Sequence, residues 1–320
     1  MTGWRRRRED LRGRAALVTG GSRGLGLLLA RELGRQGCSV MIAARDGGEL
    51  ADAATKLAGE VPELATHRCD VGVEREAEDL VGAAVAAFGR LDVLVNNAGV
   101  IQVGPATAMT VGDYRDAMDA MFFGPLVLTY RALPYLREHG GTVINISSLG
   151  GRLPAPHLLP YDAAKFALAG LSGGLHAELA ADGVHVLTVA PGLMRTGSHL
   201  GALFKGDHAR EYAWFAAASG MPVLSMDAER AARRIVDAAR RHKPDLVLTP
   251  GAHLATRAYG LAPGLTARAL TLVNRLLPAP PPHQGPAVPG AEARRKADSA
   301  VLDSATGLND TAADRFQSGE

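Results

Sequence analysis

A tyrosine and a lysine one helical turn apart are the residues of this chain best placed for acid–base chemistry. In the stretch LPYDAAKFALAG, Tyr161 lies near the start of an expected helix and Lys165 follows four residues later. This spacing puts both side chains on one helix face. A phenol titrates at about pH 10, and a neighbouring ammonium lowers its pKa by stabilising the phenolate. The pair predicts a proton donor and acceptor, although an ordinary half-buried helix tyrosine is the alternative.

A glycine-rich turn near the start of the chain predicts a site for a dinucleotide. The stretch TGGSRGLG, residues 19–26, follows an expected strand and opens an expected helix, and a second strand follows within about 30 residues. Glycines permit the tight turn, and the helix N-terminus offers free N–H groups to a pyrophosphate. The candidate cofactor-binding residues of the turn are Gly20, Ser22, Arg23, Gly24, Leu25 and Gly26.

The residues after the second expected strand indicate which dinucleotide is bound. An acidic residue there would bind the ribose 2′-hydroxyl of NAD, but the sequence IAARDGGEL has Arg45 in that place. With Arg23, this gives two guanidinium groups for a 2′-phosphate, which favours NADP(H) and leaves NAD(H) open. Asp46 weakens the inference, and Arg45 could also be an ordinary loop residue.

The elements that must position these residues alternate along the chain between apolar strands and amphipathic helices. Strands are expected at 15–20, 39–44, 65–71, 91–97, 141–148, 184–190 and 245–250, and helices at 25–36, 74–88, 111–138, 161–181 and 227–241. The strands are nearly continuous runs of apolar residues, which is typical of strands covered on both faces. The pattern predicts an α/β fold with a doubly wound, seven-stranded parallel sheet.

Composition places this sheet in a single domain with extensions at both ends. Hydrophobic residues make up 47% of the 320 residues, so a large core is expected. A basic arm at 1–13 precedes the domain at 14–250, and a helical extension at 251–277 and a disordered Pro/Ala/charged tail at 278–320 follow it. The arm does not lead into a secretion signal, and no run of eighteen apolar residues occurs, so we expect a cytoplasmic protein. Cys38 and Cys69 are expected to fill the core.

Five motifs occur together in one order: TGGSRGLG, NNAG at 96–99, NISS at 145–148, YDAAK at 161–165 and PGLMRT at 191–196. In these motifs the chain resembles the short-chain dehydrogenases/reductases over roughly residues 13–250. The resemblance implies a Rossmann-type fold, NAD(P)-dependent hydride transfer and a homo-oligomer. It implies that Tyr161 is the general acid/base, that Lys165 also binds the nicotinamide ribose, and that Ser148 holds the substrate oxygen. Ser147 fits the family's spacing less well.

The resemblance implies further contacts with the cofactor along its length. Asp70 would accept from the adenine amino group, and Val71 would pack beside the ring. The other residues implied to contact it are Asn97, Gly99, Pro191, Gly192 and Thr196. Each of these residues could equally serve only to form its loop.

One position departs from the family pattern. Family members commonly read N-x-x-G in the helix before the NISS strand, and alignment on Gly124 puts Met121 in the place of the asparagine. A thioether cannot bind the water that passes protons to the lysine, and Asp119 lies on a different helix face. The chain is therefore either an active enzyme with a re-routed proton path or a cofactor-binding protein with weak or lost turnover.

The segment after the sixth expected strand should carry the substrate determinants. Its large apolar residues are Leu193, Met194, Leu200, Leu203, Phe204, Tyr212, Trp214, Phe215 and Met221. As a mobile apolar cover they would suit a lipophilic alcohol or ketone, but they could equally pack a helix pair onto the sheet. His157, His199 and His208 lack metal-ligand spacing, so no metal is expected.

The net charge and the helical extension bear on which partners the protein binds. The net charge of +2 gives no support for a nucleic-acid partner, so a small carbonyl or alcohol substrate is the expected one. Residues 252–277 combine apolar residues with scattered arginines. This segment could lie on a membrane surface, cover the sheet edge or serve a subunit contact, and the sequence does not choose among these.

Overall fold

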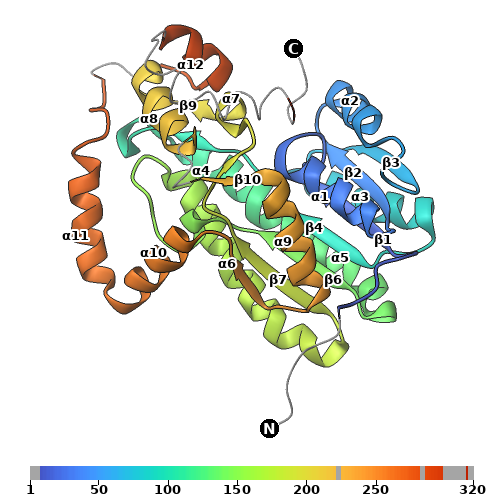
Figure 1. The fold of residues 1–320 in the computed structure, drawn as a ribbon. Coiled ribbons are helices and arrows are strands. Elements are labelled where there is room, and N and C mark those ends of the chain that lie inside the picture. The colour runs from blue at the N-terminus through green and yellow to red at the C-terminus, as the bar shows by residue number, and fades with distance from the viewer. Residues whose placement is uncertain (1–7, 221–224, 282–284, 298–314, 316–320) are drawn as a thin grey trace.

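A seven-stranded parallel sheet forms the centre of the protein (Figure 1). The computed structural model describes residues 8–220, 225–281, 285–297 and 315. The strand order is β11-β7-β6-β4-β1-β2-β3, and every pair in the sheet is parallel. The strands are β1 (Ala15–Thr19), β2 (Ser39–Ala44), β3 (Leu64–Arg68), β4 (Val93–Asn96), β6 (Thr142–Ile146), β7 (His185–Ala190) and β11 (Asp245–Val247). All seven predicted strands and the predicted fold class are confirmed.

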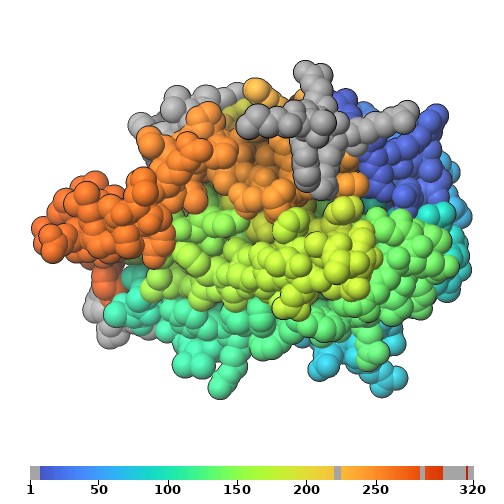
Figure 2. All heavy atoms as spheres, turned by 90° about the horizontal axis from the view of Figure 1, so that it is seen from below, coloured from blue at the N-terminus to red at the C-terminus, as the bar shows by residue number. Residues whose placement is uncertain are grey.

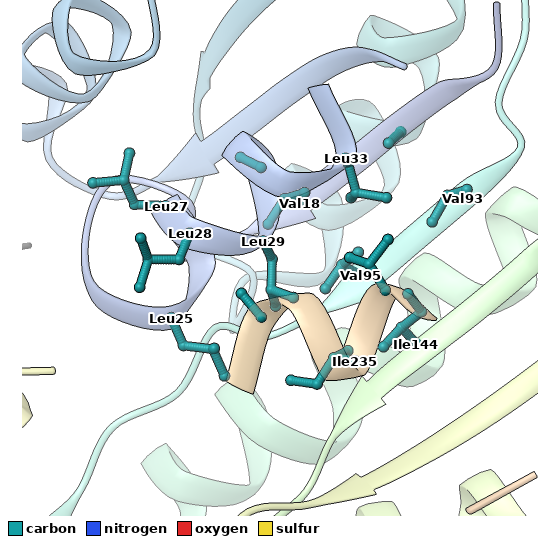
Figure 3. Close-up of a cluster of buried hydrophobic side chains, with 14 of the residues drawn as sticks. Val18, Leu25, Leu27, Leu28, Leu29, Leu33, Val93, Val95, Ile144 and Ile235 are labelled. Carbon is teal, nitrogen blue, oxygen red and sulfur yellow. The ribbon is translucent and has the colours of Figure 1, made fainter. Parts of the chain in front are cut away.

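Helices cover both faces of this sheet because its strands are apolar on both sides. One apolar layer holds α1 (Gly24–Arg35), α2 (Gly47–Leu57) and α9 (Ala228–Arg240). The other holds α3 (Glu74–Phe88), α5 (Gly124–His139) and α6 (Leu159–Leu179). Figure 3 shows Leu29 of α1 and Ile235 of α9 in one layer with Val95 and Ile144 of the sheet. The order of strands reverses between β1 and β4, which is where ligands bind in such sheets.

Helix α2 was not predicted, although its start carries a recognisable signal. Asp46 caps the helix by accepting a hydrogen bond from the Glu49 backbone N–H at 2.8 Å. An Asp followed three residues later by Glu is typical of a helix start, but Gly47 and Gly48 between them hide the pattern. The Asp46 carboxylate is therefore occupied as a helix cap.

The helix predicted over 111–138 is present as one continuous helical run, but it is not α-helical throughout. α4 (Val111–Met118) starts at the cap Thr110, a π-helical turn spans Asp119–Phe123, and α5 follows. Pro125 lies in the first turn of α5, where it has no N–H to donate back into the preceding turn. The π-helical turn therefore has a sequence cause, and it contains Met121.

A second, smaller layer forms from the segment after β7, part of the C-terminal tail and the short strand β5. It contains β5 (Gln102–Val103), β8 (Leu193–Arg195), α7 (Ser198–Gly201), β9 (Leu203–Phe204), α8 (His208–Gly220), β10 (Ser225–Asp227), β12 (Val288–Pro289) and α12 (Gly290–Lys296). Strands β12, β9 and β5 pair in one sheet, and β10 pairs with β8. Short 3-10 turns elsewhere span Ala106–Ala108, Leu149–Gly151 and Ala180–Asp182.

This layer corrects two predictions. Residues 288–296 lie within the tail expected to be disordered, yet β12 pairs with β9 and Val288 and Ala293 are buried. Phe204, Tyr212 and Phe215 were expected in a mobile cover or packed on the main sheet, but they are buried in a core of their own with this tail. Met221 lies outside the described residues.

The helical extension consists of α10 (Pro250–Leu261) and α11 (Pro263–Asn274). Pro263 begins the second helix, and Ala262 between the two has non-helical backbone angles, with φ −141° and ψ 64°. Figure 1 shows the pair leading away from the sheet rather than lying along its edge. In the described part of the chain, no helix is long and apolar enough to span a bilayer.

Candidate active site

The carboxyl end of β6 and the first turns of α6 bring Ser148, Tyr161 and Lys165 together. Ser148 follows β6 directly, and α6 begins two residues before Tyr161. The Ser148 side chain is hydrogen-bonded to Tyr161. The Lys165 Nζ lies 5.7 Å from the centre of the Tyr161 ring. The structure thus puts an ammonium, a phenol and an alcohol within one small volume.

Burial controls the protonation of this group. It raises the pKa of Tyr161 to about 12, against the lowering effect of the Ser148 hydrogen bond, while the charge of Asp162 raises it further. Burial also lowers the pKa of Lys165 to about 8. The Lys165 Nζ donates a hydrogen bond to the Ile146 carbonyl at 2.8 Å, which fixes its position. At neutral pH the site therefore holds a neutral phenol beside a charged ammonium.

The two serines at the end of the NISS motif have different environments. Ser147 is buried, and its hydroxyl donates to the Lys165 backbone carbonyl at 2.9 Å. Ser148 is half-buried and accepts from the Gly150 N–H at 3.0 Å, which leaves its hydroxyl proton free for Tyr161 or a substrate. Of the two hydroxyls, only that of Ser148 is available to a second partner beside Tyr161.

Asp162 is an ionisable residue of this site that the sequence reasoning missed. It is 2% exposed, and one carboxyl oxygen accepts from the Ala155 N–H at 2.5 Å. The other oxygen, Oδ1, lies against Gly150 and has no hydrogen-bond partner among the described residues. Burial raises the pKa of this carboxyl to about 8. An aspartate directly after the tyrosine, in an otherwise apolar helix start, was the available signal.

The glycine turn has the form of a phosphate cradle. Gly20 and Gly24 have φ values of 61° and 55°, and a Cβ on Gly26 would collide with the Gly20 carbonyl. The Asn97 side-chain amide donates to the carbonyls of Thr19 and Gly20 at 3.0 and 3.1 Å, so Asn97 holds the turn in shape. The side chain at the N-cap of α1 makes no capping hydrogen bond, which leaves the helix N–H groups for a phosphate. These features fit a dinucleotide.

The arginines expected to bind a 2′-phosphate have acidic neighbours. Glu49 accepts from the Ser22 hydroxyl at 2.8 Å and from the Arg23 guanidinium at 2.9 Å. The Arg45 side chain is 72% exposed, and its Nη1 lies 3.9 Å from an oxygen of Asp70. Glu49 was not foreseen, because it belongs to the helix that the sequence did not predict.

The remaining implied cofactor residues follow strands at the same edge of the sheet. Asp70 accepts from the Gly72 N–H at 3.0 Å, and the Pro191 carbonyl accepts from the Leu149 N–H at 2.7 Å. Thr196 is buried, and its hydroxyl accepts from the Ser198 N–H at 3.3 Å. The other three implied residues have no polar side chain. Val71 is buried, Gly99 is exposed, and Gly192 adjoins the Thr249 side chain.

Met121 lies inside the site rather than beside it. It is fully buried in the π-helical turn and packs in one apolar cluster with Ala164 and Tyr161. A Cβ on Gly99 would lie 2.9 Å from the Met121 Sδ and 3.6 Å from the Lys165 Nζ, so the thioether occupies space close to the lysine. It therefore adds to the desolvation of the acid–base pair.

The three histidines considered at the outset have separate partners. His157 pairs with Glu211 at 2.8 Å, His199 lies beside the Tyr212 ring, and the His208 Nε2 lies 3.1 Å from the Pro286 carbonyl. Within the described ranges, no group of three His, Cys, Asp or Glu residues could hold a metal ion.

This arrangement of a phosphate-binding turn, a switch point and a Ser–Tyr–Lys group is typical of nicotinamide-dependent oxidoreductases. Residues 14–201 match the family model described as short chain dehydrogenase. The chain therefore belongs to the short-chain dehydrogenase family, a family of oxidoreductases.

Relatives of known name share about a third of their residues with this chain. It is 34% identical over 202 residues to 11-beta-hydroxysteroid dehydrogenase 1A of Arabidopsis thaliana, covering 62% of this chain and 57% of that protein. It is 33% identical over 192 residues to dehydrogenase/reductase SDR family member 4 of Homo sapiens, covering 59% of this chain and 69% of that one. The chain thus spans little more than half of the Arabidopsis protein.

Among solved structures, L-sorbose reductase from Gluconobacter frateurii, complexed with NADPH and L-sorbose, has a similar fold. The TM-score is 0.67 at 22% sequence identity, and the match covers 75% of this chain and 97% of that chain. This likeness supports the fold.

Proposed function

We propose that this protein reduces a lipophilic carbonyl compound, with NADP(H) as its favoured cofactor and Tyr161 as its acid/base. The observation that carries the proposal is the meeting of Ser148, Tyr161 and Lys165 at the carboxyl edge of the sheet, the edge at which the glycine turn also follows its strand. Three groups suited to one proton transfer converge where the cofactor of this family binds.

The roles follow from the protonation of the three residues. When bound, a reduced nicotinamide supplies a hydride to the carbonyl carbon. Tyr161, whose pKa is raised to about 12, is protonated at neutral pH and gives its proton to the carbonyl oxygen. Ser148 donates a hydrogen bond to the same oxygen, and the Lys165 ammonium stabilises the phenolate that remains. In alcohol oxidation, Tyr161 accepts the proton instead.

The preference for NADP(H) rests on the two arginines. Arg23 and Arg45 can face a 2′-phosphate, and Asp46 is occupied as the cap of α2. Glu49 opposes this preference, because its carboxylate pairs with Arg23 and Ser22 and must give way to a phosphate. NAD(H) remains the alternative cofactor.

Half-buried apolar residues of the smaller layer support a lipophilic substrate. They are Leu193, Leu200, Leu203 and Trp214. By its name, the Arabidopsis relative acts on hydroxysteroids, which are lipophilic alcohols. Phe204, Tyr212 and Phe215 are excluded from direct contact by their burial. We also expect a cytoplasmic homo-oligomer, on the family's pattern.

Met121 supports a second candidate function, in which the protein binds the cofactor with weak or no turnover. A buried thioether next to Lys165 cannot hold a water molecule that relays protons to the lysine. This candidate shares every cofactor contact with the first and differs only in catalysis.

Oxidation of NADPH by the purified protein tests both candidates. The substrates are aldehydes, aliphatic ketones and steroidal ketones, and the proteins are wild type, Tyr161→Phe, Met121→Asn and the control Tyr130→Phe. Tyr130 is 58% exposed on α5, so its hydroxyl should not matter. NADPH binding, followed by cofactor fluorescence, is measured for all four.

The enzyme proposal expects turnover in wild type and Tyr130→Phe and a loss of at least about a hundredfold in Tyr161→Phe with binding retained. Turnover that appears only in Met121→Asn supports the cofactor-binding candidate. Equal turnover in wild type and Tyr161→Phe refutes the role of Tyr161.

A further inference from the structure

The helix pair α10–α11 exposes its apolar side chains instead of burying them. Of residues 250–277, all of which the structure describes, only Ala252 is buried. Figure 2 shows the pair projecting beyond the rest of the molecule. In the described part of the chain, ten large apolar side chains are exposed, and six of them belong to the pair α10–α11. These six are Leu254, Leu261, Leu265, Leu272, Val273 and Leu276. Apolar side chains gathered in this way mark an interaction surface.

The leucines recur with a helical period. Leu265 and Leu272 lie seven residues apart on α11, and Leu254 and Leu261 lie seven apart on α10. Because seven residues make almost two turns, each pair forms a stripe on one side of its helix. Their exposed fractions are 70% and 60% on α11 and 73% and 87% on α10. Each helix is therefore amphipathic with its apolar side open.

The charges of the pair are all of one sign. Residues 250–277 contain Arg257, Arg268 and Arg275 but no Asp or Glu. Arg268 and Arg275 are also seven residues apart, so they follow the leucine stripe of α11 along one flank. An arginine beside an apolar stripe can keep its guanidinium at the level of lipid phosphates while its stem lies among the apolar chains.

We propose that α10 and α11 dock this protein on an anionic lipid surface. The exposed leucines would enter the boundary between headgroups and acyl chains, and the three arginines would pair with phosphates. A symmetric contact between two copies fits less well, because it would oppose arginines with no acidic partner in the segment. The proposal stands independently of the proposed catalysis.

The start of α10 relates this surface to the active site. Thr249 caps α10, and its side chain adjoins Gly192, one of the residues implied to contact the cofactor. Docking through α10 and α11 would therefore hold the carboxyl edge of the sheet near the lipid, where a lipophilic substrate is concentrated.

Sedimentation with vesicles tests the docking. The full chain is mixed with vesicles of phosphatidylcholine alone or with phosphatidylglycerol added, and bound protein is measured in the pellet. The variants are Leu265→Ser/Leu272→Ser and Arg268→Gln/Arg275→Gln. Val111→Ser is the matched control, since Val111 is 65% exposed on α4. All four side chains changed in the test variants are exposed, so circular dichroism should report unchanged folding.

The proposal expects binding that requires the anionic lipid and weakens with salt. The leucine variant should bind at least about tenfold more weakly. The arginine variant should lose roughly thirtyfold, because each cation contributes about a fivefold gain near an anionic surface. Val111→Ser should bind as wild type. Equal binding by the leucine variant, or no binding by wild type, overturns the proposal. So does a wild-type dimer in analytical ultracentrifugation that the leucine variant abolishes without any vesicle binding.

Discussion

The buried carboxyl of Asp162 should make the free energy of unfolding of this protein depend on pH. The substitution Asp162→Asn should remove this dependence. Burial raises the pKa of Asp162 from 3.8 to about 8. Between these values the native state holds a proton that the unfolded state has released. The free energy of unfolding therefore falls as the pH rises through this window. Below about pH 4 the contribution of Asp162 is fully present, and above about pH 8 it is lost.

The size of the effect follows from the pKa shift. A shift of about 4 units corresponds to about 6 kcal/mol over the whole window and about 4 kcal/mol between about pH 5 and about pH 8. Asp162→Asn keeps the shape of the side chain and an acceptor for the Ala155 N–H, but it cannot ionise. Its own stability should lack this part of the pH dependence.

Urea unfolding followed by circular dichroism, at several values between about pH 5 and about pH 8, measures this difference. The free energy of unfolding of wild type minus that of Asp162→Asn should fall by several kcal/mol with rising pH. A constant offset, from amide protons left without partners, does not affect this slope. Asp116→Asn, on the exposed side of α4, serves as the control for the removal of a surface carboxylate.

A difference that stays flat across this range would refute the reasoning, since it would mean that the Asp162 carboxyl ionises as easily in the native state as in the unfolded one. A second readout concerns the neighbouring phenol. The charge of Asp162 raises the pKa of Tyr161, so the pH profile of alcohol oxidation should move to lower pH in Asp162→Asn.

Three further substitutions test the cofactor site and the C-terminal segment. Glu49→Gln removes the carboxylate that pairs with Arg23, so the KM for NADPH should fall roughly fivefold while the KM for NADH changes little. An equal change in both KM values would show that Glu49 does not oppose a 2′-phosphate. Gly26→Ala places a Cβ against a carbonyl of the glycine turn, so NADPH fluorescence titration should show binding lost, and unaltered affinity would contradict the tight fit. Gly290→Ala places a Cβ against the His199 carbonyl, so it should weaken the packing of α12 on α7 by about 1–3 kcal/mol and speed hydrogen exchange in α7. Unchanged hydrogen exchange would show that α12 does not stabilise α7.

The strands of the main domain were predictable because a nearly continuous run of apolar residues of this length indicates a buried strand. The strands that became β1, β4 and β6 are nearly continuous apolar runs, and such runs are typical of strands covered on both faces. The carboxyl ends of parallel strands meet at one edge, so motifs that follow successive strands converge there. This is why the glycine turn, Ser148 and Tyr161 could be expected to meet before any coordinates were known.

The errors fall where distant segments or single side chains decide the outcome. Helix α2 has two glycines in its first turn, and intrinsic propensity argues against a helix there. The C-terminal residues 288–296 have little periodicity of their own, and they fold because β9 and α8 offer them an apolar partner. The composition of a segment does not show which distant residues will pack against it.

The sequence by itself determined the family and the positions of the main strands along the chain, and its spacing put Tyr161 and Lys165 on one helical turn. Only the tertiary structure decided how those groups are charged. The raised pKa of Tyr161, the lowered pKa of Lys165 and the packing of Met121 with Tyr161 all depend on burial. Burial is a property of every element packed around a residue, and no stretch of sequence contains it.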